Sequence, residues 1–408
     1  MSIAKDMQVN EPGMQPGAGF VGQLGRVLRE NIRDYGMFIA LFVIWIVFAI
    51  LTDGVFLSSR NISNLFNQFG YIAVLGIGMT LVIVIRHIDL SVGYLAGFLG
   101  AVAAIAMTSW GMPVWAVIPA VLIIGAILGL IPGFLVARMG IPAFVATLAG
   151  FLVYRGAILV ATEATGTIII DNDAFNALGN GFIPNLFADL VPGVHLLTLL
   201  LGLLAVAFFI YSEIKGRRVK MAYNFEVLPT NIFILKLVFI ALLVGGAAWV
   251  LANYNGLSWT VVIVLIVLGI WHFVTNQTVL GRHIYAVGGN PEAAELSGVN
   301  VKRITFLIFS QMGMLAGLSG MMFASRLQSA TTTAGQAWEL DAIAAAFVGG
   351  VSAAGGVGRV MGAVIGALVM ASLTSGMNLM GIGISYQYIV RGIVLALAVI
   401  FDVATRNR

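Results

Sequence analysis

The chain contains no cysteine and little charge, since only 9% of its 408 residues are Asp, Glu, Lys or Arg. The absence of cysteine excludes disulfide bonds, thiolate metal sites and a thiol nucleophile. The shortage of charge excludes an ordinary soluble domain, in which about a quarter of the residues are charged. Because 60% of the residues are hydrophobic, the composition predicts a protein that lies mostly within a lipid bilayer.

Motifs for chemistry are also missing. There is no GxxxxGK[ST] phosphate loop, and the glycine-rich run 349–362 lacks the Lys-Ser/Thr that such a loop needs. This run is expected to form a tight turn followed by close helix packing. The four histidines show neither metal-ligand spacing nor a catalytic arrangement; they are His87, His195, His272 and His283. We therefore expect no catalytic residue, metal or cofactor in this chain, and no nucleic-acid partner.

Twelve apolar segments follow one another along the chain, and most are long enough to cross a membrane as helices. They predict an all-α polytopic membrane protein with about 10–12 transmembrane helices, in one domain over 37–403. The segment 339–353 is short and is expected to be a broken or half-length helix. The segments are 37–52, 65–85, 90–108, 114–136, 142–161, 191–211, 232–252, 258–274, 304–325, 339–353, 358–377 and 386–402.

The distribution of basic residues predicts the orientation, because cytoplasmic loops are enriched in Lys and Arg. With the N-terminus inside and twelve crossings, sixteen of the 21 basic residues lie on the cytoplasmic side. Only Arg60 and Arg326 lie outside, while Arg155, Lys236 and Arg391 fall within segments. Lys236 is expected to snorkel, and Arg155 or Arg391 either snorkels or lines a polar route. Residues 1–36 and 404–408 are thus predicted to be cytoplasmic.

A short helix is predicted in the cytoplasmic loop 275–303. Asn290 is a favourable N-cap, and Pro291 suits the first helical position. Glu292 and Glu295 add negative charge toward its N-terminal half, and Gly298 provides a C-terminal stop. Such a helix of about two turns is marginal in water by itself. It either lies on the cytoplasmic face of its own chain or docks against a partner.

This loop resembles the coupling loop of permeases of ATP-binding-cassette importers for monosaccharides, in the ribose, xylose and galactose branch. The similarity covers about 60–165 and 258–403. The motifs that carry it are Gly288–Ala294, Ser297–Val299, Ala334–Gly335, Trp338–Ala345, Gly349–Ser352, Gly355–Arg359, Gly376–Leu379, Ile88–Gly93 and Gly140–Leu148. The residues that the resemblance assigns to coupling with an ATPase are Gly289, Asn290, Pro291, Glu292, Ala293, Ala294, Glu295 and Gly298.

The resemblance implies a division of labour in the bacterial inner membrane. The chain would be a multi-pass permease that pairs with a second copy and binds a cytoplasmic ATPase, which uses the ATP. A periplasmic binding protein would deliver a xylose-, galactose- or glucose-like monosaccharide. The outer loop 162–190 is either a solvated loop or a docking site for this protein, with the loop 326–338 as the other contact. The alternative function is a secondary transporter driven by an ion gradient.

Two features depart from the resemblance. The glycine pair usual before Ile-Asp-Leu-Ser is Arg86-His87 in this chain, and residues 191–252 add about two spans relative to shorter members. The longer layout is most similar to the xylose and multiple-monosaccharide branches, although the chain itself does not identify its sugar.

Several polar residues beside or within the apolar segments are candidates for the translocation path. Asp89, followed by Ser91, and the pair Glu339 and Asp341 each begin an apolar segment rich in small residues. They are expected either to cap helices near a membrane interface or to contact sugar hydroxyls, and their similar placement suggests an internal repeat. Three amides either cross-link helices or line the path; these are Asn67, Gln68 and Asn378.

Overall fold

The computed structural model describes residues 32–187, 192–225 and 227–406. Most of the N-terminal segment 1–36, and residues 407–408 of the predicted tail, lie outside these ranges. The elements, in chain order, are α2 (Ile32–Leu51), η1 (Val55–Leu57), α3 (Ser59–Val84), α4 (Val92–Thr108), α5 (Val114–Ala137), α6 (Ala143–Thr162), β1 (Thr167–Ile169), α7 (Asp173–Asn180), α8 (Leu196–Ala222), α9 (Thr230–Ala252), α10 (Trp259–Gln277), α11 (Val279–Gly289), α12 (Pro291–Leu296), α13 (Val301–Leu327), β2 (Ser329–Thr331), α14 (Trp338–Val348), α15 (Val360–Leu379) and α16 (Ile384–Arg406).

Each of the twelve apolar segments forms a helix, so the predicted all-α membrane fold is confirmed. Nine helices within the described ranges are long and apolar enough to cross a bilayer, and α2 and α4 are shorter apolar helices. The segment expected to be half-length is α14, whose 11 residues span about 16 Å. A hydrocarbon core of about 30 Å is roughly twice that length.

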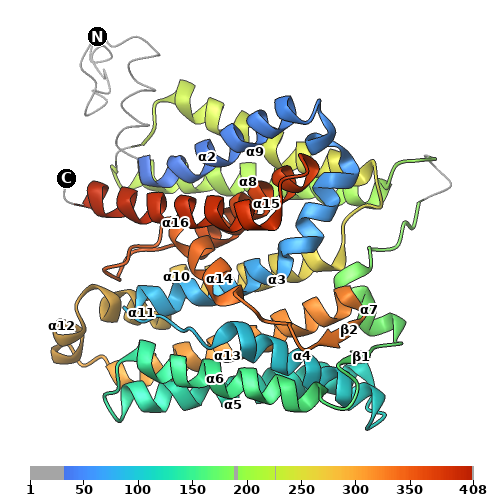
Figure 1. Ribbon diagram of the computed structural model, residues 1–408. Helices are drawn as coiled ribbons and strands as arrows, with labels where there is room; N and C mark the ends of the chain where they lie inside the picture. Colours follow the sequence, from blue (N-terminus) through green and yellow to red (C-terminus); the bar gives the residue numbers. More distant parts are fainter. Residues whose placement is uncertain (1–31, 188–191, 226, 407–408) are drawn as a thin grey trace, which may run out of the picture.

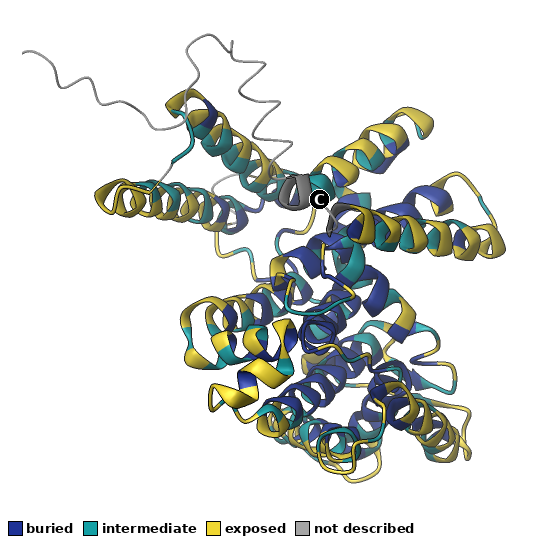
Figure 2. Ribbon diagram, turned by 90° about the vertical axis from the view of Figure 1, so that its left-hand side faces the viewer, coloured by how far each residue is buried: buried dark blue, intermediate teal, exposed yellow. Residues whose placement is uncertain are grey.

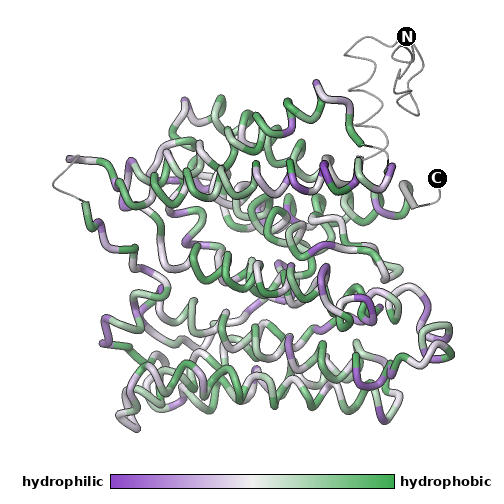
Figure 3. The backbone as a smooth tube through the Cα atoms, turned by 180° about the vertical axis from the view of Figure 1, so that it is seen from behind, coloured by the Kyte–Doolittle hydropathy of each residue, from purple (hydrophilic) through white to green (hydrophobic). Residues whose placement is uncertain are grey.

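The helices divide into a buried centre and an exposed periphery (Figure 2). Most residues of α3, α13 and α15 are buried, whereas α8, α9 and α16 are largely exposed although they are strongly apolar. The helices are predominantly hydrophobic along their lengths (Figure 3). Exposed apolar helix faces are what a lipid-facing protein presents, since lipid rather than water is the solvent there.

The two ends of the bundle differ. At one end α12 projects, and the start of α2 and the end of α16 lie at the same end of the bundle, apart from α12 (Figure 1). At the other end β1 and β2 form a two-stranded antiparallel sheet, in which Thr167 pairs with Thr331. We call these the α12 end and the sheet end. The sheet joins the two loops that the sequence assigned to the same outer face.

Helices α3–α6 and α13–α16 form two similar sets that run in opposite directions. Helix α13 packs on α5 and α4, and in the same way α3 packs on α15 and α14. The corresponding helices α3 and α13 run toward the α12 end and away from it, respectively. This arrangement agrees with the internal repeat suggested by the two acidic positions, and it is the inverted type found in transporters.

Helices α8 and α9 pack mainly against each other at the periphery. An ion pair of 2.7 Å between Lys236 and Glu213 joins them, so Lys236 has a partner within the chain. These helices make up most of the predicted two-span insertion 191–252, which stays a prediction.

Candidate functional site

Helix α12 has the caps that the sequence predicts. The Asn290 side chain accepts a hydrogen bond from the Ala293 N–H at 3.1 Å, and Pro291 occupies the first turn. At the other end Gly298 has a φ of 87°, a left-handed conformation that terminates the helix. The Val299 N–H then donates to the Ala294 carbonyl at 3.0 Å. The short helix is therefore fixed by its own caps.

Most of α12 is exposed. Only Ala294 is buried against the rest of the chain, while Glu292, Ala293 and Glu295 face outward. Leu296 is 91% exposed, an unfavourable position for a leucine in water. The sequence interpretation did not single out Leu296, although an apolar residue on a capped polar helix was a visible signal.

The end of α11, which directly precedes α12, lies against the end of α3. We call this contact the junction, and it is formed by Val84, Arg86, Gly288, Gly289 and Gly356. The Gly356 N–H donates to the Val84 carbonyl at 2.8 Å. Arg86 donates from Nε to the Gly288 carbonyl at 2.7 Å and from Nη2 to the Gly289 carbonyl. Gly288 is so close to the Val84 carbonyl that a Cβ would overlap it. The junction thus joins α3, α11 and the loop between α14 and α15.

Two further contacts hold the 349–358 loop, which forms the predicted tight turn. The Tyr285 hydroxyl on α11 donates to the Gly358 carbonyl at 2.7 Å. Burial raises the pKa of Tyr285, so its hydroxyl keeps this proton at neutral pH. From α16, Asp402 accepts hydrogen bonds from the Ser352 hydroxyl and the Ala353 N–H at 3.1 and 3.2 Å. The predicted close packing follows, since Gly362 on α15 touches Gly349.

The N-termini of α4 and α14 meet inside the bundle. Asp89 accepts hydrogen bonds from the Ser91 N–H at 2.9 Å and the Ser91 hydroxyl at 2.6 Å, whereas the N-cap residue of α4 is Ser91, whose side chain makes no capping hydrogen bond. Asp89 is 2% exposed and lies inside the protein. Gly93 in the first turn of α4 lies against the Glu339 carboxylate and the Gly335 carbonyl, where a larger residue would overlap both.

Two helices that are shorter than the about 20 residues of a full span begin at this meeting point, and we call them the half-helices. From it α4 runs about 25 Å toward the sheet end, and α14 runs about 16 Å toward the α12 end. The segment 85–91 and the loop 332–337 lead to it from opposite ends. Non-helical backbone at this depth is tolerated because protein surrounds it.

The predicted capping role is wrong for Glu339 and Asp341, because α14 begins after Ala337 without a side-chain cap. Both carboxylates lie in its first turn instead, where negative charge is favourable. Glu339 is buried, and its Oε2 has no hydrogen-bond partner among the described residues. Next to it Tyr71, Phe323 and Trp338 form an aromatic cluster with ring centroids 4.4–5.1 Å apart.

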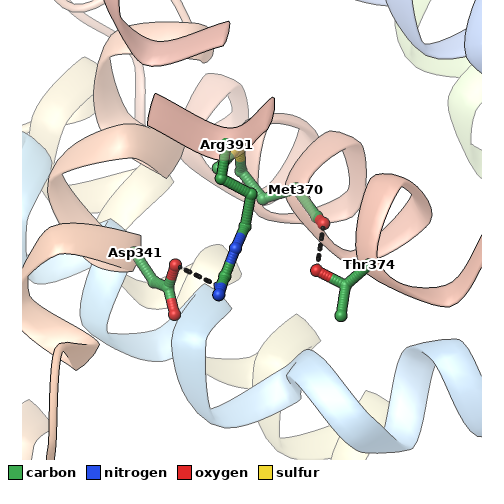
Figure 4. A network of polar contacts seen from close by, with 4 residues as sticks. All are labelled: Asp341, Met370, Thr374 and Arg391. Carbon is green, nitrogen blue, oxygen red and sulfur yellow. Dashed lines mark hydrogen bonds and ion pairs between the residues drawn. The ribbon is translucent and has the colours of Figure 1, made fainter. Parts of the chain in front are cut away.

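Asp341 forms an ion pair with Arg391 of α16 at 2.9 Å (Figure 4). The Arg391 side chain reaches past Met370 and Thr374 of α15 toward α14 (Figure 4). The side chains of Arg391 and Asp341 are 15% and 23% exposed, respectively. Arg391, which the sequence left between snorkelling and a polar route, therefore ties a half-helix to a peripheral helix.

The three amides do not gather at the meeting point. Asn67 and Gln68 are half-buried on α3, about one turn from Tyr71, and the Asn67 Oδ1 has no hydrogen-bond partner among the described residues. Asn378 lies at the end of α15 and accepts a hydrogen bond from the Gln387 side chain at 2.7 Å. Asn378 thus links two helices, which is the first of its two predicted roles.

The sequence matches a known family over most of its length. The family model described as "Branched-chain amino acid transport system / permease component" matches residues 61–399. The chain belongs to this permease family. It is therefore a component of a transport system rather than an enzyme by itself. No solved structure matches the chain.

Individual relatives of this permease are more specific than the family description. It is 40% identical over 380 residues to the xylose transport system permease protein XylH of Haemophilus influenzae, covering 93% of this chain and 98% of that protein. It is 38% identical to the XylH protein of Escherichia coli K12, covering 93% of each chain. It is also 35% identical to the ribose import permease protein RbsC of Haemophilus influenzae, covering 93% of this chain and 95% of that protein.

Proposed function

We propose that this permease forms the membrane pathway of an ATP-driven importer for a monosaccharide, with xylose and similar aldoses as the substrate class. The family description names branched-chain amino acids, but the relatives that match nearly the whole chain are named for xylose and ribose. Identity of 40% over almost the full length of a xylose permease is the more specific guide to the substrate.

The observation that carries this proposal is the exposed, rigid helix α12. Leu296 and the carboxylates of Glu292 and Glu295 face away from the chain. A leucine exposed next to charged groups favours a partner that covers it, because burial removes its apolar surface from water. We assign its partner as a cytoplasmic ATPase subunit, which binds and hydrolyses the ATP, while this chain binds no cofactor. In the complete importer two permease copies in the inner membrane hold two such subunits.

The junction suggests how closure of the ATPase opens the path. Movement of α12 is passed through Gly288 and Gly356 to the end of α3 and to the loop that follows α14. The end of α3 leads into the half-helix α4, and the loop follows the half-helix α14. The N-termini of these two half-helices meet at Gly93. When the half-helices separate, Asp89, Ser91 and Glu339 become accessible. The Glu339 Oε2, which has no partner within the described part of the chain, can then accept a hydrogen bond from a sugar hydroxyl.

The sheet end would receive the sugar from a periplasmic binding protein. The β1–β2 sheet holds the two outer loops together and so provides a defined surface for docking. Transient passage requires weak contacts at several polar sites rather than one tight site.

Sugar uptake into proteoliposomes tests the proposal. Permease, ATPase and trapped ATP are combined with binding protein and radiolabelled xylose outside. We expect uptake that requires the trapped ATP and persists in the presence of a protonophore. Uptake that needs no ATP and stops with the protonophore would instead establish the ion-driven alternative.

A variant of α12 provides the internal control. Changing Glu292 to Lys should lower ATP-dependent uptake while the amount of inserted permease stays the same. Normal uptake and normal ATPase coupling in this variant would count against docking through α12.

A further inference from the structure

Arg86 has an unusual backbone conformation. Its φ of 67° lies in the left-handed region, which residues other than glycine rarely occupy because Cβ crowds the backbone. This conformation ends α3, where the Arg86 N–H donates to the Ile83 carbonyl at 2.8 Å. A glycine would adopt it without strain. An arginine in this strained conformation, where similar permeases usually have glycine, points to a role for its side chain.

The side chain explains why the strain is tolerated. Nε and Nη2 of Arg86 donate to the carbonyls of Gly288 and Gly289, the last two residues of α11. Carbonyls at a helix C-terminus lack partners within the helix and favour a positive charge. Two parallel donors on one rigid plane fix orientation as well as distance, which a single ammonium group does not. Arg86 thus holds the end of α11 through two hydrogen bonds to Gly288 and Gly289, and we call this contact the clasp.

The clasp lies between the two moving parts of the proposed mechanism. On one side Asn290, which caps α12, directly follows Gly289. On the other side only five residues separate Arg86 from Val92, the first residue of α4, and Asp89 is among them. A pull on α12 therefore reaches the start of α4 through the guanidinium of Arg86 and a short stretch of backbone.

We propose that Arg86 is the positioning residue that transmits the movement of α12 to the half-helix α4, an inference that rests on the proposed function. Arg86 touches neither the sugar nor the ATPase in this role. Its removal uncouples the two parts and leaves each of them intact.

Three substitutions separate transmission from simple stabilisation. Arg86→Met removes the guanidinium but keeps the length of the side chain. Arg86→Gly also removes the clasp, but it relieves the strained backbone and so protects the fold. Arg86→Lys keeps the positive charge but replaces the two parallel donors of the guanidinium with one ammonium group. Arg138→Met is the matched control, since Arg138 is an exposed arginine at the end of α5.

Each variant is purified with its ATPase and reconstituted in the proteoliposomes described above. Two quantities are measured: the sugar imported per ATP hydrolysed, and the temperature of thermal unfolding. We expect Arg86→Met and Arg86→Gly to bind the ATPase normally and hydrolyse ATP, while sugar imported per ATP falls at least about tenfold, since a tenfold loss corresponds to only one of the two charge-assisted hydrogen bonds that are removed. Arg86→Gly should unfold at the same temperature as the wild type or higher. Arg86→Lys should be intermediate, and Arg138→Met unchanged.

The possible failures are distinguishable. If Arg86→Gly imports as much sugar per ATP as the wild type, the clasp does not transmit movement. If the ATPase no longer binds Arg86→Gly, the clasp is merely structural, and the inference is wrong. If the wild type imports sugar without ATP, the proposed function itself fails, whatever the variants do.

Discussion

Breaking the ion pair between Arg391 and Asp341 should destabilise the permease measurably. Arg391→Met removes the guanidinium that holds α16 to the half-helix α14 and leaves the Asp341 carboxylate without its counter-charge. The two groups are 2.9 Å apart and are 15% and 23% exposed. Losing one partner of a fully buried pair costs about 3–5 kcal/mol, whereas an exposed pair contributes about 0–1 kcal/mol. Partial burial therefore predicts a loss of about 2 kcal/mol.

A double-mutant cycle measures this loss. Arg391→Met, Asp341→Asn and the double variant are unfolded in mixed micelles by titration with sodium dodecyl sulfate, and the free energy of unfolding is compared. The double variant should lose less than the sum of the single variants, because no uncompensated charge remains.

The chain offers a matched control in the pair Lys236 and Glu213, which is 2.7 Å long but about a third exposed. Lys236→Met should cost less than about 1 kcal/mol. If Arg391→Met costs no more than Lys236→Met, or if the two changes at the buried pair are simply additive, the reasoning from burial is refuted.

Three further outcomes follow from the contacts. Gly93→Leu should lower both sugar uptake and the thermal unfolding temperature, because its side chain would push α4 from α14, while Gly156→Leu, at a site with open space, should change neither. Leu296→Lys should weaken binding of the ATPase about tenfold in a pull-down titration, with an unchanged unfolding temperature because Leu296 is exposed. Asn378→Leu should reduce the free energy of unfolding in detergent by about 1 kcal/mol through loss of the hydrogen bond to Gln387. If Gly93→Leu, Leu296→Lys or Asn378→Leu leaves its measured quantity unchanged, the role given to that residue's contact is wrong.

Features encoded over short stretches of sequence were predictable. Apolar runs mark helices because the bilayer requires every backbone group to be paired within its segment. Asn290, Pro291 and Gly298 mark α12 because caps are local and depend on residue type. The short segment that forms α14 was also recognisable from its length alone.

Features that depend on distant contacts were not predictable. The departure at Arg86 was visible, but its partner, Gly288, is 202 residues away. The contact of Asp89 with Ser91 is local and was predictable, but the approach of Gly93 to Glu339 was not, because the loop 332–337 leads to this point from the other end of the bundle. The strands β1 and β2 are three residues each and lie within loops. Such short strands are fixed by pairing rather than by sequence pattern.

Accessibility of α12 is the most direct test of the account. The chain has no cysteine, so Leu296→Cys introduces a unique thiol for a membrane-impermeant maleimide. The account predicts labelling in inside-out vesicles, none in right-side-out vesicles, and protection when the ATPase is bound. Labelling from the periplasmic side, or labelling that the ATPase leaves unchanged, would contradict the claim that α12 is the docking helix.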